Sequence, residues 1–417
     1  MSVALKGKRI LLLIPPITYR ATDFVLAANR LELDVVIGSS GALPLGGSPV
    51  VKVDPIDLRG SVRRLLATVG PVDAVVAVDS DMLPLAAALG AALNLTGNAP
   101  DAVAAAADKA IQRRLWLGAG VAQPRFRAIA ADADAPSVLA AAWSVGFPCV
   151  AKPVSLSASR GVLRADDEAA LARAVAEIRA ILAEMGGYGR ETILLEEYVP
   201  GAELSIDGLL TDGRLAVTAI FDKPDTPDGP TFEETLLVTP SRLPSATLAA
   251  ATNLAQRAAQ ALGLRYGPIH AELRIDGRAG DARPVMLELA ARSIGGLCSR
   301  SLRFAGGVSL ETMILLNALG AEVETAPPPG AAGVLMLPVE RAGVLRSVDG
   351  QADARAVAGI TGLSITLPIG QTVRPLPWGD RYLGFIFAEG REASEVETAL
   401  RRARDCLRAV IAATASP

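Results

Sequence analysis

Two apolar strands joined by a turn-rich connection constrain the fold of this chain more than any other stretch. The first, GPIHAELRI, places His270, Glu272 and Arg274 on one face and apolar residues on the other. The second, PVMLELA, is apolar except for Glu288. If the strands form a hairpin centred near residue 280, Glu272 lies opposite Glu288 on the same face.

This register also pairs Ile275 with Val285 and Leu273 with Leu287. The two opposed carboxylates then repel by roughly 3 kcal/mol at an effective dielectric of about 20. Either a cation lies between them or one is protonated, and a site with only oxygen ligands suits Mg²⁺ or Mn²⁺. The alternative is a shifted register in which both acids are solvated.

The single histidine of the chain, His270, shares its face with Glu272. We expect it at the rim of the same polar site. An ordinary hydrogen-bonded residue of the sheet is the alternative.

Lysines suited to bind phosphate occur upstream of the hairpin. Lys152 ends the apolar strand CVAKP, and the loop SLSASRG that follows supplies the Ser157 hydroxyl, Gly161 and backbone N–H groups. Lys109 interrupts an alanine-rich helix. The alternatives are an edge lysine whose ammonium reaches solvent for Lys152 and a helix-surface lysine for Lys109.

The stretch LLEEYVPGAE offers hydrogen-bond acceptors on both sides of a Pro-Gly break. Glu196, the backbone at Tyr198 and Val199, and Glu203 form a compact set that complements an adenine amino group and a ribose diol. Acids at a strand end are otherwise usually solvated.

Composition and charge exclude several classes of protein. The chain has 417 residues, a net charge of −3 and no basic block, so we expect no nucleic-acid partner. Three well-separated cysteines favour the reducing cytoplasm. The apolar run near the N-terminus is too short to span a bilayer, so we expect no membrane association.

The order of elements predicts several units. Buried strands alternate with amphipathic helices over residues 1–95, which indicates a doubly wound parallel sheet, although the phosphate-binding motifs G-x-G-x-x-G and G-x-x-x-x-G-K-[ST] are both absent. An α+β region follows to about residue 322. Residues 332–417 indicate a small β-rich unit behind the linker TAPPPGAAG.

In their order along the chain, these motifs resemble the ATP-grasp superfamily, and most closely its bacterial L-amino acid ligases. The likeness rests on VAKP, LLEEYVPGAELSIDG, GPIHAELRI, VMLELAARSIGG, FDKPDTPDGPTFEETLLVTPSRL, GQTVRPLP and YLGFIFAEG. It implies a multidomain α/β and α+β protein with a Rossmann-like domain at 1–95, an ATP-grasp domain at 96–322 and a C-terminal ligase-type domain at 332–417. The ATP-grasp domain combines a lid at about 140–210 with a larger antiparallel sheet.

The resemblance also implies roles for the candidate residues. Lys109, Lys152 and Ser157 would bind the ATP phosphates. Glu196, Tyr198 and Val199 would bind adenine, and Glu203 would bind the ribose. Glu272 and Glu288 would bind the metal, and the catalytic residues would be Arg292, Lys152 and His270. One departure is Ala290, which occupies a position where many relatives carry a third metal ligand, asparagine.

The implied reaction joins a small-molecule carboxylate to an amine, both expected to be amino acids, through an acyl phosphate with release of ADP and phosphate. Alternatives are a purine-pathway or carboxyphosphate-forming ligase and a non-catalytic nucleotide-binding module. Homodimers are frequent in relatives, so a homodimer is one assembly we expect.

Overall fold

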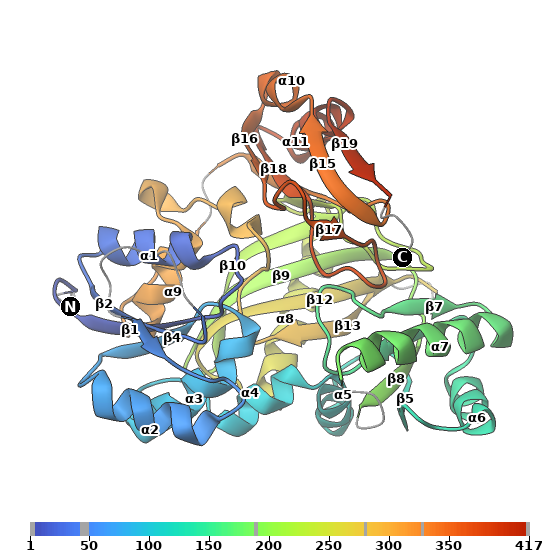
Figure 1. Ribbon diagram of the computed structural model, residues 1–417, viewed down its shortest axis with the longest axis horizontal. Coiled ribbons are helices and arrows are strands. Elements are labelled where there is room, and N and C mark those ends of the chain that lie inside the picture. The colour runs from blue at the N-terminus through green and yellow to red at the C-terminus, as the bar shows by residue number, and fades with distance from the viewer. Residues whose placement is uncertain (1–4, 42–49, 187–190, 279–281, 327–328, 414–417) are drawn as a thin grey trace.

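The computed structural model describes residues 5–41, 50–186, 191–278, 282–326 and 329–413. An N-terminal parallel sheet, a lid and a C-terminal part surround a large central sheet (Figure 1). Within the described ranges, no helix is both long and apolar enough to cross a lipid bilayer.

The N-terminal part is the doubly wound parallel sheet that the sequence predicts. Its strand order is β3-β2-β1-β4, and every pairing is parallel. Helices cover both faces, and α9, from much later in the chain, packs beside α1 on one of them. The elements are β1 (Arg9–Ile14), α1 (Ala21–Arg30), β2 (Asp34–Ser39), β3 (Val50–Lys52), α2 (Leu58–Thr68), β4 (Ala74–Ala77), η1 (Ser80–Met82), α3 (Leu83–Ala92) and α9 (Leu310–Ala318).

The lid is a four-stranded antiparallel sheet in the order β5-β8-β6-β7, packed against two helices. Two helices precede it, and the Asp108 side chain caps the second by accepting a hydrogen bond from the Ile111 N–H. The elements are α4 (Pro100–Ala107), α5 (Lys109–Gly118), β5 (Phe126–Ala130), α6 (Ala135–Val145), β6 (Cys149–Pro153), β7 (Leu163–Ala165), α7 (Glu168–Glu184) and β8 (Thr192–Glu197).

The central sheet has eight strands in the order β13-β12-β9-β10-β11-β14-β18-β16. Helix α8 buries its alanine-rich face against β12 and β13. The elements are β9 (Ala202–Thr211), β10 (Arg214–Lys223), β11 (Leu236–Thr239), α8 (Ser245–Ala261), β12 (Gly267–Asp276), β13 (Arg283–Ala290), η2 (Cys298–Ser301), η3 (Ala305–Gly307), β14 (Ala331–Leu337), β16 (Ile360–Ile365) and β18 (Gly384–Gly390).

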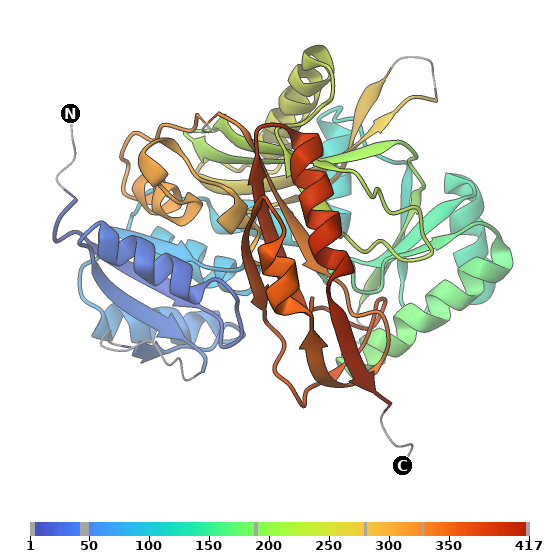
Figure 2. The same ribbon diagram turned by 90° about the horizontal axis from the view of Figure 1, so that it is seen from above.

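The C-terminal part contributes three strands to the central sheet and adds a second, three-stranded sheet in the order β17-β15-β19. Helix α11 lies across β14 and β18, as the view from above shows (Figure 2). Backbone hydrogen bonds between β11 and β14 therefore join this part to the rest of the protein. The remaining elements are β15 (Gly343–Asp349), α10 (Gln351–Ala356), β17 (Thr372–Val373), α11 (Ala393–Asp405) and β19 (Arg408–Ala412). The domain boundaries expected from the sequence stay a prediction.

In the hairpin β12–β13, Glu272 pairs with the expected residue, but the residues between Glu272 and the turn do not. Glu272 pairs with Glu288, whereas Leu273 pairs with Met286, so the predicted pairing of Leu273 with Leu287 is wrong. The predicted pairing of Ile275 with Val285 is wrong for the same reason. A β-bulge at this point inserts one extra residue into β13 and shifts the register toward the turn.

Candidate active site

One large cavity brings the predicted site residues together. It has a volume of about 780 Å³ and lies where the lid, the central sheet, the N-terminal loops and a C-terminal loop meet. The residues to which the family resemblance gives a role all line it, whereas Gly161 does not; they are Lys109, Lys152, Ser157, Glu196, Tyr198, Val199, Glu203, His270, Glu272, Glu288 and Arg292.

On the lid side, Lys152 and Glu196 line the cavity, and the buried Arg113, outside the lining, contacts Glu196; we call these three residues the basic wall. Glu196 lies 2.8 Å from the Lys152 Nζ and 2.5 Å from the Arg113 Nε. Burial alone would raise the pKa of Glu196, but the two cations outweigh it and hold the pKa at about 2. Burial lowers the pKa of Lys152, and Arg113 lowers it further, against the opposing effect of Glu196. Two cations that share one carboxylate can still attract an anion such as a phosphate.

Lys109 adds a third cation next to this wall. Only 8% of the residue is exposed, so it is not a helix-surface lysine. Its ammonium donates to the Leu156 carbonyl at 2.7 Å and lies 3.2 Å from Glu288. Lys109 therefore joins the loop that contains Ser157 to the central sheet.

The central-sheet side contributes a cluster of carboxylates, and we call Glu203, Glu234 and Glu272 the acidic wall. All three lie beside the Lys223 ammonium, Glu203 at 2.7 Å and Glu272 at 3.8 Å, with Glu234 in direct contact. Burial would lower the pKa of Lys223, but the three carboxylates raise it well above its ordinary value. Burial raises the pKa of Glu234; Lys223 opposes the rise, and Glu272 and Glu203 add to it. Arg274 and His270 also lie beside Glu203 and Glu272, so three basic side chains surround the three carboxylates of the acidic wall.

The acidic wall fits a divalent metal ion. Each of its members offers one carboxylate oxygen, and these atoms lie within 4.8 Å of one another. A set of oxygen donors with room for substrate phosphates is what Mg²⁺ prefers. The set differs from the predicted pair of Glu272 and Glu288, since Glu203 and Glu234 complete it and Glu288 ion-pairs with Lys109. Lysine ammonium groups thus lie beside both opposed glutamates and supply the expected nearby cations without a metal ion.

His270 joins the acidic wall to a buried aspartate. Its Nδ1 lies 3.2 Å from both Asp207 carboxylate oxygens, and its Nε2 lies 3.3 Å from Glu272. Burial would lower the pKa of His270, but Asp207 and Glu272 raise it to about 9. At neutral pH the imidazole is a cation, which orients Glu272 and is unsuited to act as a general base.

The nucleotide-side candidates are fixed by arginine contacts. Arg274 donates to the Val199 carbonyl at 2.8 Å and to Glu203 at 2.8 Å, so it ties the predicted adenine and ribose positions together. Its guanidinium also lies 5.3 Å from the centre of the Tyr198 ring.

Arg292 reaches the cavity from the segment after β13. It donates to the Ser80 hydroxyl at 3.0 Å and to the Ser293 carbonyl at 2.8 Å. Among the residues that the structure describes, no carboxylate ion-pairs with it, so its charge is available to a bound anion.

Sequence reasoning missed several residues of the site. Lys223 was detectable, because FDKP repeats the strand-end pattern of VAKP around Lys152. Arg113 resembles any helix-surface arginine, yet it is buried and also donates to the Leu287 carbonyl at the bulge, at 2.6 Å. Glu234 and Asp207 carry no local signal, since their partners come from distant segments.

Two family models match the chain. Residues 145–301 match the ATP-grasp domain, and residues 335–412 match the L-amino acid ligase C-terminal domain 2. Together they span most of the residues that line the cavity.

Several known proteins are similar to this chain. The crystal structure of L-amino acid ligase from Bacillus licheniformis has a TM-score of 0.80 at 26% identity, over 98% of this chain and all of that one. The uncharacterized protein y4rH of Sinorhizobium fredii is 26% identical over 95% of this chain and 82% of its own length. Carnosine synthase 1 of Gallus gallus is 34% identical over 49% of this chain but only 23% of that protein.

Proposed function

This chain is an ATP-grasp carboxylate–amine ligase with a C-terminal domain of the L-amino acid ligase type, and from that premise we propose that it joins two L-amino acids through an acyl phosphate. ATP is converted to ADP and phosphate in the process. The observation that carries the proposal is the meeting of the basic wall, the acidic wall and Arg292 in one cavity.

The reaction proceeds in two steps. A carboxylate oxygen of the first amino acid attacks the γ-phosphorus of ATP, and ADP leaves with the electrons of the bond that breaks. The amine nitrogen of the second amino acid then attacks the acyl carbon, and phosphate departs as the amide forms and the nitrogen loses a proton. No side-chain nucleophile is required, so catalysis comes from positioning and charge neutralisation.

The cations of the chain hold the reacting phosphoryl group. Lys152 and Lys109 bind phosphate oxygens, and Ser157 donates from the loop above them. Arg292 faces the acyl phosphate and offsets the charge that develops as phosphate leaves.

The acidic wall, with Glu288, would hold Mg²⁺ or Mn²⁺, which would supply positive charge to offset that of the phosphates. Lys223 keeps Glu203 and Glu234 in position. His270 is a positioning residue for Glu272 and does not accept a proton in the reaction.

The rest of the cavity supports an amino acid with an apolar side chain. Leu237, Ile294, Met336 and Leu367 line it, together with Tyr382. These side chains complement an aliphatic or aromatic group by excluding water from it.

Phosphate release from ATP and Mg²⁺, measured with pairs of L-amino acids, tests this function. We expect one ADP and one phosphate for each dipeptide, with the dipeptide identified by mass spectrometry. Release with bicarbonate alone would indicate a carboxyphosphate-forming ligase. Intact ATP binding without release in any amino-acid pool would indicate a nucleotide-binding module. The expected homodimer stays a prediction, which light scattering of the purified protein tests.

A further inference from the structure

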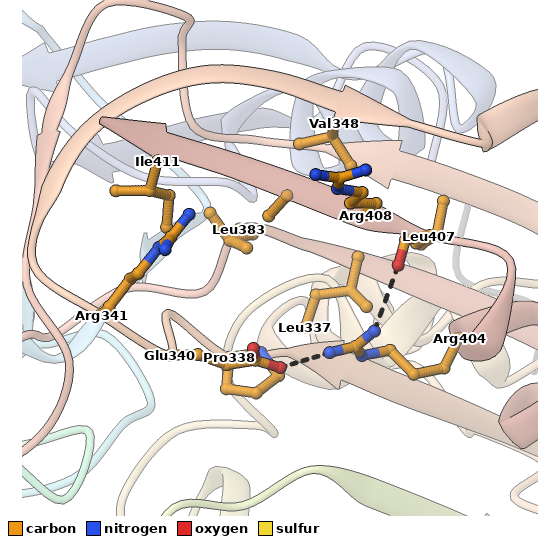
Figure 3. Close-up of a pocket in the computed structure, with 11 residues that line it drawn as sticks. Leu337, Pro338, Glu340, Arg341, Val348, Leu383, Arg404, Leu407, Arg408 and Ile411 are labelled. Atoms are coloured by element: carbon orange, nitrogen blue, oxygen red, sulfur yellow. Dashed lines mark hydrogen bonds and ion pairs between the residues drawn. The ribbon is translucent and has the colours of Figure 1, made fainter. Parts of the chain in front are cut away.

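A second, smaller cavity lies in the C-terminal part, and we call it the C-terminal cavity. Its volume is about 290 Å³, and none of its lining residues lines the catalytic cavity. It opens between the end of β14, the strands β15 and β19, and the end of α11 (Figure 3). This volume is at the lower end of cavities that hold small molecules.

The floor of the C-terminal cavity is apolar. Its side chains belong to the core of the C-terminal part, and each residue is no more than 8% exposed; they are Leu337, Val348, Leu383, Leu407 and Ile411. Apolar side chains at the bottom of an open cavity favour a ligand whose own body is apolar.

The rim of the C-terminal cavity is basic. Arg404 contacts Glu340 and also donates to the Leu407 carbonyl at 3.4 Å. Arg341 and Arg408 also line the cavity, and Figure 3 shows their side chains on either side of Leu383. In the ranges that the structure describes, neither of these two guanidinium groups has a side-chain hydrogen bond or ion pair.

Two arginines without partners beside an apolar floor define the chemistry of a ligand. A guanidinium binds a carboxylate through paired N–H donors, and Arg341 and Arg408 are both exposed, so a ligand from solvent can reach them. We propose that the C-terminal cavity binds a small carboxylate with an apolar body, held by Arg341 and Arg408. Both a free amino acid and the C-terminal end of a dipeptide carry this chemistry.

The position of the cavity couples it to catalysis, an inference that rests on the proposed function. Leu337 and Leu383 line the C-terminal cavity, while their chain neighbours Met336 and Tyr382 line the catalytic cavity. The Leu383 N–H also donates to the Leu337 carbonyl at 2.8 Å, so the shared wall is one strand pair thick. A ligand that shifts this wall changes the affinity of the catalytic cavity for the apolar amino acid.

Calorimetric binding of 4-methylpentanoate to the full-length protein, saturated with ADP and Mg²⁺, tests the site. We expect the uncharged 4-methylpentan-1-ol to bind at least about tenfold more weakly, and the double variant Arg341→Ala/Arg408→Ala to lose about tenfold or more for each arginine. Arg402→Ala, an exposed arginine of α11 outside the cavity, should bind as the unaltered protein does.

Equal binding to the double variant and to Arg402→Ala would overturn the site, as would absence of binding at millimolar concentration. L-leucine and Leu-Leu, titrated in the same way, distinguish the two sources of the carboxylate. If a ligand in the C-terminal cavity leaves the KM of every amino-acid substrate unchanged, the proposed coupling between the two cavities is wrong, but the proposed binding site is not contradicted. Because binding is measured without turnover, failure of the proposed function is distinguishable from failure of this site.

Discussion

Two lysines at strand ends, Lys152 on β6 and Lys223 on β10, share a sequence context but occupy opposite electrostatic surroundings. Each precedes a proline, and each is buried. Lys152 shares its single carboxylate, Glu196, with Arg113, whereas Lys223 contacts all three members of the acidic wall. Under the proposed function, phosphate oxygens would bind beside Lys152 at the lid, and the metal ion would bind the carboxylates of the central sheet.

We expect the largest effect on activity from a substitution in the acidic wall. Glu272→Gln removes one charge from the predicted metal ligands while keeping the shape of the side chain. We expect kcat to fall by about 10²–10³-fold and the Mg²⁺ concentration at half-maximal rate to rise. Steady-state rates across a Mg²⁺ titration measure both quantities. Glu322→Gln, an exposed glutamate outside the cavity, is the control, and a variant as active as this control would refute the metal role.

We expect the second-largest effect from a substitution in the basic wall. Lys152→Met leaves Glu196 paired with Arg113 alone, so the excess positive charge disappears. We expect kcat/KM for ATP to fall by about 10²-fold, with little change in the Mg²⁺ requirement. The matched control is Lys52→Met, which alters an exposed lysine at the end of β3. If the Mg²⁺ requirement moved as far as it does in Glu272→Gln, the two walls would not be separate.

The sequence predicted some features of the two walls and not others. Alternation in GPIHAELRI placed Glu272 on a polar face, and the assumption of a hairpin centred near residue 280 then paired it with Glu288, a pairing that the structure confirms. The bulge at Leu287 was not predictable, since it accompanies a hydrogen bond from Arg113, which lies far away in sequence. The acidic wall is assembled from three separate strands and loops, so only tertiary structure reveals Glu234 as its third member.

The pH dependence of stability tests the basic wall independently of catalysis. Because the pKa of Glu196 is about 2 in the folded protein and about 4.5 ordinarily, its ionised form stabilises the fold above pH 4.5, and this contribution is lost as pH falls toward 2. We expect Glu196→Gln to be less stable than the unaltered protein at pH 7 by about 3 kcal/mol. Urea unfolding should show this gap shrinking by about 1 kcal/mol between pH 7 and pH 4. A gap that stays constant over this range would contradict the lowered pKa.

The two walls also differ in how they are held. The acidic wall lies mainly in the central sheet, whereas the basic wall belongs mostly to the lid, which a C-terminal loop contacts. The Gly161 N–H donates to the Pro377 carbonyl at 3.0 Å, and the Trp378 Nε1 donates to Glu177 on α7 at 2.6 Å. Arg374 donates to both Glu184 oxygens at 2.8 Å. These contacts fix the lid relative to the C-terminal part.

The smallest expected effect comes from loosening this contact. Trp378→Phe removes the hydrogen bond to Glu177, so the lid should close over ATP less favourably. We expect the KM for ATP to rise about twofold to fivefold, with the Mg²⁺ requirement unchanged, because a single partly exposed hydrogen bond contributes about 1 kcal/mol. Trp143→Phe is a matched control, since Trp143 makes the same kind of bond to Glu168 within the lid itself. Equal KM values for the two variants would show that the C-terminal loop does not help to position the basic wall.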